Sequence, residues 1–278
     1  MPIVADFDSQ TIHPPNNPQP DTQTTLNFPE TFVARPRLPH GFRALEVDKS
    51  SNIRVKSTNQ YFTRTWADCH ITTWDDTNVN SGIDDTFVLA PADMDFQTGE
   101  HMRNLLINPD DPVSIRVNFE YPFITSPKVL TWFNYIDLDK SKNWRLKTTA
   151  TDVDVNGFTL NIEATGDTIL YTAQACWLAY PEDRTHIWSA SVSTTEVHPV
   201  NQPQTQTSKA VTFGNGVEFW KNPNVFVALN SFDIGCQTDF RIKAAVDNVT
   251  QNGLTWHIDT WGDTTLYSAS ASIIAINP

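Results

Sequence analysis

Two short stretches, Asp239-Phe240-Arg241 and, twenty residues after the arginine, Trp261-Gly262-Asp263-Thr264, show how this chain of 278 residues is organised. The same pattern occurs twice more, at Asn52-Ile53-Arg54 with Trp74-Asp75-Asp76-Thr77, and at Asn143-Trp144-Arg145 with Thr165-Gly166-Asp167-Thr168. The spacing from arginine to the second stretch is the same in all three places. A pattern that recurs at a fixed spacing indicates internal repeats, each built as the same structural unit.

Other markers recur at matched places in the three copies. A phenylalanine precedes each arginine by 26 or 28 residues, a proline lies between them, and an acidic residue stands eight positions before each arginine: Phe28, Phe119 and Phe213; Pro36, Pro127 and Pro223; Glu46, Asp137 and Asp233. The spacing predicts three tandem repeats, which we place at residues 1–94, 95–182 and 183–278.

The strand pattern within each copy has a period of two. Apolar side chains alternate with polar ones over residues 158–164 and 254–260, which predicts strands with one buried face. Asn156-Gly157 and Asn252-Gly253 stand just before these segments, where Asn-Gly favours a tight hairpin, whereas the first copy has Thr65-Trp66 there. No long stretch has apolar residues at helical spacing. We therefore expect an all-β chain of three tandem antiparallel β-sandwiches.

Composition excludes several classes of function. With 19 Lys and Arg against 32 Asp and Glu, the chain has a net charge of −13, which disfavours nucleic acid as a partner. No apolar run approaches the ~20 residues that span a bilayer, so membrane insertion is not expected. The first residues do not resemble a signal peptide, so we expect a cytoplasmic protein or one released without such a signal. The three cysteines match no zinc pattern, and no metal or cofactor is expected.

The strand phase identifies candidate binding residues. If Phe240 and Ile242 point into the core, Arg241 points outward, and Trp261 falls in the outward row of a later strand. Core packing does not require an outward arginine and tryptophan, but a sugar fits them, because its C–H face stacks on indole while guanidinium and carboxylate bond its hydroxyls. The alternative is that the tryptophan packs against a neighbouring repeat or a partner protein and the arginine forms an ordinary surface ion pair.

These motifs resemble the H-type lectins, the family of the snail agglutinin and the C-terminal domain of the discoidins. The resemblance covers most of the chain and implies six-stranded sandwiches in a trimer-like arrangement within one chain that bind galactose or N-acetylgalactosamine. It also implies the carbohydrate-binding residues: Asp239, Arg241, Trp261, Gly262 and Tyr267 in the third copy, the most complete set; Asn52, Arg54, Trp74 and Asp75 in the first; and Asn143, Arg145, Gly166 and Tyr171 in the second.

The copies depart from the family pattern in three respects. The first copy has Asn80 where the tyrosine belongs, and the second has Thr165 in place of the tryptophan. An acidic contact from a loop of the neighbouring unit, which the family uses, has no clear match: Asp21, Asp110 and Asp111 lie at inconsistent spacings, and the third copy has Gln202 and Gln204 in that region.

The sequence therefore predicts a non-enzymatic, multivalent carbohydrate-binding protein with glycans as partners, expected as a monomer with internal pseudo-threefold symmetry. No catalytic residues are expected, since no carboxylate pair stands out by spacing and Gly-x-Ser-x-Gly does not occur. A structural or protein-interaction module that uses the same tryptophan and arginine face, and a glycan-active enzyme, are the alternatives.

Overall fold

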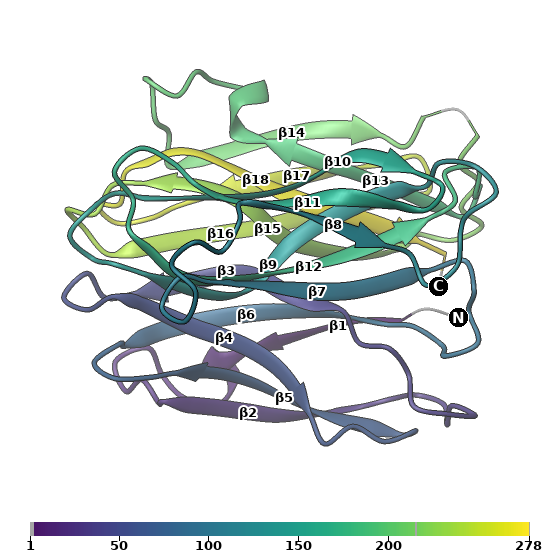
Figure 1. The fold of residues 1–278 in the computed structure, drawn as a ribbon, viewed down its shortest axis with the longest axis horizontal. Helices are drawn as coiled ribbons and strands as arrows, with labels where there is room; N and C mark the ends of the chain where they lie inside the picture. The colour runs from purple at the N-terminus through teal and green to yellow at the C-terminus, as the bar shows by residue number, and fades with distance from the viewer. Residues whose placement is uncertain (1–2, 215, 278) are drawn as a thin grey trace.

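In a computed structural model, which describes residues 3–214 and 216–277, the chain is built from strands joined by loops, with two short 3₁₀ turns, Ser9–Thr11 and Thr194–Glu196. Repeat 1 holds β1 to β6, repeat 2 holds β7 to β12 and repeat 3 holds β13 to β18 (Figure 1). Their bounds are β1 Ile3–Asp8, β2 Asp21–Asn27, β3 His40–Val47, β4 Ile53–Gln60, β5 Trp66–Thr73, β6 Val79–Val88, β7 Gln97–Asn104, β8 Ser114–Asn118, β9 Lys128–Leu138, β10 Trp144–Asp154, β11 Gly157–Ala164, β12 Leu170–Tyr180, β13 Ile187–Ser193, β14 Gln206–Thr212, β15 Asn224–Ile234, β16 Phe240–Asp247, β17 Gly253–Asp259 and β18 Leu266–Ile276.

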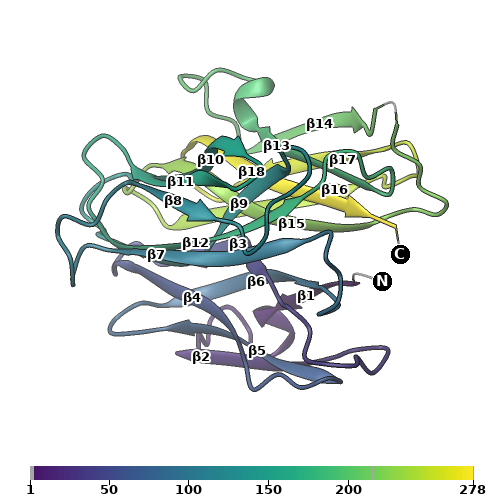
Figure 2. The ribbon, with the colours of Figure 1, turned by 45° about the vertical axis from the view of Figure 1, so that its right-hand side comes forward.

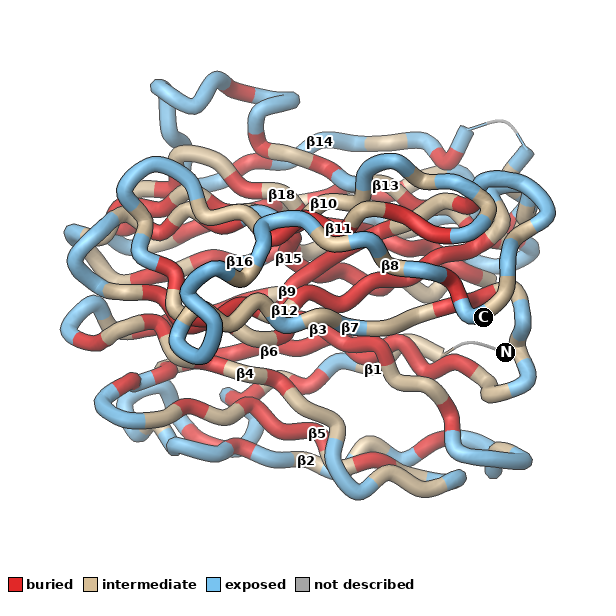
Figure 3. The backbone as a smooth tube through the Cα atoms, viewed as in Figure 1, coloured by how far each residue is buried: buried red, intermediate tan, exposed pale blue. Residues whose placement is uncertain are grey.

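Burial along the strands follows the predicted alternation. In β16, Phe240 and Ile242 are fully buried, Arg241 is partly exposed and Lys243 is exposed. Figure 3 shows the same division for the whole chain, with buried backbone along the strands and exposed backbone in the loops. The apolar row of each strand therefore fills a sandwich core, and the polar row is left for other contacts.

The hairpin predicted in repeat 2 is present, but the structural requirement for its glycine differs from the expected one. Asp154 pairs with Gly157 across a two-residue turn. A Cβ at Gly157 would lie 2.1 Å from the carbonyl oxygen of Val117 on β8, and a Cβ at Gly253 would lie 2.3 Å from that of Val211. Each glycine is therefore required by the close approach of the strand beside it in the sheet rather than by the turn.

The strand order joins each repeat to the other two. Each of the three six-stranded antiparallel sheets combines three strands of one repeat with three of another: β1-β6-β3-β16-β17-β14, β13-β18-β15-β10-β11-β8 and β2-β5-β4-β9-β12-β7. The junctions are the pairs β4·β9, β10·β15 and β16·β3, so the last junction returns from repeat 3 to repeat 1. Figures 1 and 2 show the repeat 1 strands β2, β4 and β5 on one side of β7, β9 and β12. The repeats form a closed ring.

A separate apolar cluster lies where the three repeats meet. It contains side chains from all of them, among them Phe87, Trp132 and Phe226, whose rings are in contact. Trp132 fills space beside Gly41, where a Cβ would lie 2.1 Å from the indole ring. The indole nitrogen of Trp132 also donates to the carbonyl oxygen of His40, 2.8 Å away. The large side chain of Trp132 is thus matched by a missing side chain in the preceding repeat, as close packing requires.

The predicted all-β fold with three sandwich repeats is confirmed. Within the described residues, no helix has the length and apolar character that crossing a membrane requires.

Candidate functional site

Three equivalent polar sites lie at the three junctions between repeats. We name them the Arg54, Arg145 and Arg241 sites, after the arginines on β4, β10 and β16. The side chains of these arginines are 17%, 25% and 16% exposed. In each strand the arginine alternates with buried apolar residues, which holds its guanidinium on the polar face of the sheet.

The acidic partner of each arginine comes from the next repeat. Arg54 Nε lies 3.8 Å from Asp137 Oδ1, Arg145 Nε lies 3.2 Å from Asp233 Oδ1, and Arg241 Nε lies 3.1 Å from Glu46 Oε1. These acids stand eight positions before the arginines of their own repeats, a spacing visible in the sequence. Their role as partners of an arginine from another repeat is not visible in the sequence, because it depends on which strands pair across the junction. The three sites are therefore composite, each made by two repeats.

The acids expected from the neighbouring loop have other contacts. The carboxylate of Asp21 bonds His70 and Thr72 of its own repeat, and Asp111 accepts from the backbone N–H of Asn104. The neighbour's acidic contribution that the structure shows comes from the middle strands β3, β9 and β15 instead.

The aspartate and threonine of the repeated motif fix the loop that carries the tryptophan. The aspartate accepts from the arginine of its own repeat: Arg54 to Asp76 at 2.5 Å, Arg145 to Asp167 at 2.8 Å and Arg241 to Asp263 at 2.8 Å. The threonine hydroxyl donates to the carbonyl oxygen two residues before that arginine, from Thr77, Thr168 and Thr264. The loop is thus tied to the arginine strand in the same way in every copy.

The residue after the tryptophan position has a left-handed backbone in all three copies. The φ angles are 54° at Asp75, 64° at Gly166 and 65° at Gly262. A Cβ at Gly166 or Gly262 would also lie within 2.9 Å of the arginine Nη1. Glycine meets both requirements. Asp75 carries a side chain there, and its carboxylate lies 3.6 Å from Arg54 Nε.

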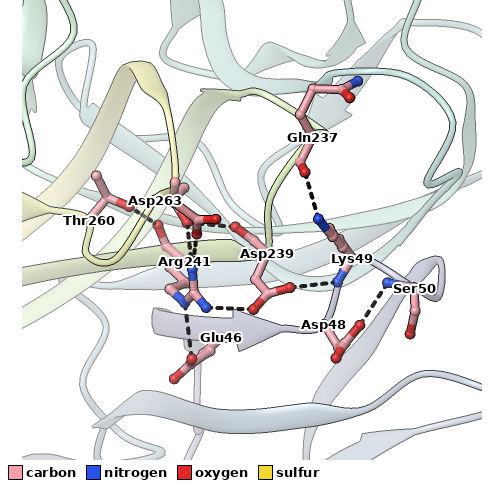
Figure 4. A network of polar contacts seen from close by, with 10 residues as sticks. Glu46, Asp48, Lys49, Ser50, Gln237, Asp239, Arg241, Thr260 and Asp263 are labelled. Atoms are coloured by element: carbon pink, nitrogen blue, oxygen red, sulfur yellow. Dashed lines mark hydrogen bonds and ion pairs between the residues drawn. The ribbon is translucent and has the colours of Figure 1, made fainter.

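The predicted ligands two residues before each arginine hold the neighbouring repeat's loop. Asn52 accepts from the backbone N–H of Lys140 at 3.1 Å, Asn143 from that of Cys236 at 3.2 Å, and Asp239 from that of Lys49 at 3.1 Å. Figure 4 shows the last of these, with Asp239 between Lys49 and Arg241. The second oxygen of Asp239 accepts from Arg241, so this carboxylate already has two partners in the protein.

Aromatic side chains distinguish the Arg54 site from the others. Trp74 is half-buried and its ring contacts Tyr135 of repeat 2, with centroids 5.1 Å apart. Tyr135 lies on β9 two residues before Asp137 and pairs with Lys56. Sequence reasoning missed Tyr135, since the matching positions in the other repeats hold Ala44 and Ser231 and so give no repeated signal.

Strand pairing regroups the tyrosines. Tyr171 precedes Thr172, which pairs with Asp137, and its hydroxyl donates to Asp139 at 2.8 Å, so it accompanies the Arg54 site. Tyr267 precedes Ser268, which pairs with Asp233, the partner of Arg145. Asn80 precedes Ser81, which pairs with Glu46, the partner of Arg241. The sequence predicted that each of these residues belongs with the arginine of its own repeat. The strand register instead places each of them beside the arginine of the preceding repeat in the ring.

The outcome is three sites of different completeness. The Arg54 site combines Trp74, Tyr135 and Tyr171 with arginine and acid. The Arg145 site has Tyr267 but Thr165 in place of the indole. The Arg241 site has Trp261 and Gly262, with Asn80 in the tyrosine position. The first site, rather than the third, carries the fullest aromatic set.

Burial raises the pKa values of two acids at these sites. It raises the pKa of Asp137 to about 6, against the lowering effect of Arg54, and Asp75 adds to the increase. Burial likewise raises the pKa of Asp233, although Arg145 opposes the change. The hydrogen bond from Arg145 lowers the pKa of the exposed Asp167. Near pH 7 these acids accept hydrogen bonds as carboxylates.

The Arg54 site offers polar groups in a fixed arrangement beside an aromatic surface. Oδ1 of Asp137 is buried and, apart from its 3.8 Å ion pair with Arg54, has no hydrogen-bond partner among the described residues, which leaves it capacity to accept a hydroxyl. The guanidinium donates in a planar fork, and indole presents an apolar face. These groups suit a ligand with several hydroxyls and one apolar face. No group of three or more metal-ligating side chains occurs in the part of the chain that the structure describes.

Comparison with known protein families identifies the repeats. The family model of the H-type lectin domain matches the chain three times, at residues 23–82, 114–180 and 208–276, which together make more than half of it. The chain belongs to the H-type lectin family. A search of the curated proteins finds no match. Membership of this family makes the chain a carbohydrate-binding lectin in the general sense, in a family that is not enzymatic.

Proposed function

We propose that this H-type lectin binds galactose or N-acetylgalactosamine at the junctions between its repeats, with the Arg54 site as the strongest. The observation that carries the proposal is the composite site itself, in which Arg54, Trp74 and Tyr135 come together with Asp137. Oδ1 of Asp137 has only its 3.8 Å ion pair with Arg54 and no hydrogen bond among the described residues. The apolar face of the sugar stacks on Trp74, and its hydroxyls bond Arg54 and Asp137. The family resemblance supports the galactose type of sugar.

Multivalency is part of the proposal. A shallow sugar site buries little area and competes with water for each hydroxyl, so one site binds weakly. The Arg54 and Arg241 sites each have a tryptophan and are held in one ring, which raises binding to a glycan-bearing surface through effective concentration. The chain then works as a monomer with internal pseudo-threefold symmetry.

A glycan array with the wild-type protein, followed by retention on agarose, tests this function. We expect signal on galactose- or N-acetylgalactosamine-terminated glycans, and loss of retention in Trp74→Ala/Trp261→Ala. Both tryptophans are half-buried at the surface, so the variant should keep its fold, which circular dichroism checks.

An array without signal, or retention that persists in the double variant, would contradict the proposal. Loss of self-assembly in the double variant, without any sugar binding by the wild type, would support a protein-interaction module instead. Turnover of a galactoside substrate would indicate a glycan-active enzyme.

A further inference from the structure

A groove of about 400 Å³ runs between repeats 1 and 2, beside the Arg54 site. Its walls combine apolar side chains of Leu38, Phe62 and Met102 with polar ones of Asn59, Asn134 and Gln174. Tyr135 connects the two places, because it lines the groove and also contacts Trp74. Lys56, which pairs with Tyr135, lines the groove two residues from Arg54. The groove and the Arg54 site therefore adjoin one another.

The other two junctions have grooves of about 350 and 270 Å³ at the same place, and there the residue that corresponds to Asn134 contacts side chains of the protein. At the junction of repeats 3 and 1, Arg43 lies 3.4 Å from both Asp6 and Asp85. At the junction of repeats 2 and 3, Asn230 Nδ2 donates to Ser191 and Ser272, at 2.9 Å each. Arg43 thus has ion-pair partners and Asn230 has hydrogen-bond partners, although Arg43 Nε and Asp85 Oδ1 make no hydrogen bond among the described residues.

Asn134 occupies the position of Arg43 and Asn230 in the groove between repeats 1 and 2, and its side-chain amide is poorly paired. The side chain is 2% exposed, its nitrogen has only long contacts, 3.4 Å to His40 Nε2 and 3.5 Å to Glu100 Oε2, and its oxygen has no partner among the described residues. Oδ1 of Asn59 is likewise buried without a partner in the described part of the chain.

A buried amide without a partner costs free energy unless a water or a ligand bonds it. The groove around Asn134 presents amide groups, a tyrosine and apolar carbon together. Planar amides bond vicinal hydroxyls, and apolar side chains contact C–H faces, so the lining matches a saccharide.

We propose that this groove is a second sugar subsite, in which a residue linked to the sugar held at the Arg54 site bonds the side-chain amides of Asn134 and Asn59. The inference rests on the proposed function, because the first sugar anchors the second. It makes the Arg54 site selective for an oligosaccharide, whereas Arg43 is held by ion pairs and Asn230 by hydrogen bonds to side chains of the protein.

Isothermal titration calorimetry with mono- and disaccharides tests the subsite. The probes are methyl β-galactoside, methyl α-N-acetylgalactosaminide, lactose and galactosyl-β1,3-N-acetylgalactosamine. We expect a disaccharide to bind one site per chain about three- to tenfold more tightly than the monosaccharides, the effect of one added hydrogen bond. Asn134→Leu, which replaces the unpaired amide with an apolar side chain branched at the same carbon, should abolish this preference and leave monosaccharide affinity unchanged.

Two further variants make the result specific. Gln174→Ala, at a less buried position of the groove, should also reduce the preference, which covers the case in which Asn134→Leu does not fold. Asn230→Ala is the matched control: it breaks two hydrogen bonds and should lower the melting temperature, with the disaccharide preference intact.

No preference for either disaccharide in the wild type, or a preference that persists in Asn134→Leu and Gln174→Ala, would overturn the subsite. If neither monosaccharide binds, the proposed function itself fails, and the subsite fails with it.

Discussion

The Arg54 and Arg145 sites have the same framework and different surfaces. In both, the arginine bonds the aspartate of the following loop, faces an acid of the next repeat and lies beside an asparagine that holds the neighbour's loop. Of these two sites, the Arg54 site alone has an indole, Trp74, which is supported by Tyr135. The contacts that build the ring are thus kept in every copy, while the groups that would touch a sugar vary from one site to the next.

The largest expected effect comes from removing the aromatic surface on which this comparison depends. Trp74→Ala should weaken N-acetylgalactosamine binding at the strongest site by about 30-fold or more, the size expected when a central aromatic contact is truncated. Thr165→Ala, at the matching position of the Arg145 site, should leave affinities unchanged. Calorimetric titration of both variants measures this, and equal losses in the two would remove the distinction between the sites.

The reverse substitution sharpens the comparison. Thr165→Trp places an indole in the Arg145 site, where Arg145, Asp233 and Tyr267 are already present. We expect an added binding site per chain with an affinity gain of about tenfold over wild type at that site, from stacking on the new ring. Titration stoichiometry is the readout, and an unchanged number of sites would show that the framework lacks more than the tryptophan.

The pH response should also test the role of the acid at the Arg54 site. Because the pKa of Asp137 is about 6, this acid is a carboxylate at pH 7.5 and becomes protonated below pH 6, when it no longer accepts a hydroxyl in the same way. Affinity at the Arg54 site should therefore fall between pH 7.5 and pH 5 by about three- to tenfold, the value of one hydrogen bond. Asp137→Asn should bind weakly at both pH values, and a wild-type affinity independent of pH would exclude this role for Asp137.

The smallest effect concerns the residue after the tryptophan position. Asp75→Gly should raise stability by about 0.5–1 kcal/mol, because glycine adopts the left-handed conformation without strain, less whatever the Asp75–Arg54 ion pair contributes. Gly166→Ala should lower stability by about 1–2 kcal/mol, since its Cβ meets Arg145 and the backbone is strained. Thermal unfolding of both variants gives the two signs, and a stabilising Gly166→Ala would contradict the account.

Much of the fold follows from patterns within a repeat. The alternation around Arg241 and the recurring spacing to Trp261 predicted the sandwiches and the polar row, because both depend on residues close together in the sequence. The family match over three segments confirms the repeats. The placing of the repeat boundaries at residues 94 and 182 stays a prediction.

The composition of each site could not be read in the same way. Glu46, Asp137 and Asp233 stood out by spacing, yet their role requires knowing that each middle strand pairs with the preceding repeat. The grouping of Tyr171 and Tyr267 depends on the same pairing. Tyr135 occurs in one junction only, and the side chains that line the groove beside it differ from those of the grooves at the other two junctions. Repetition, the signal that identified the rest, therefore does not mark them.

Closure of the ring within one polypeptide changes how such sites can evolve. In a trimer of identical chains, a substitution that removes an indole removes it from every junction at once. Here each junction is encoded separately, so the Arg145 site could lose its tryptophan while the strands around it kept the ring together. A single chain can therefore carry sites of different strength and selectivity. A substitution can change the ligand of one site while the other sites keep their binding.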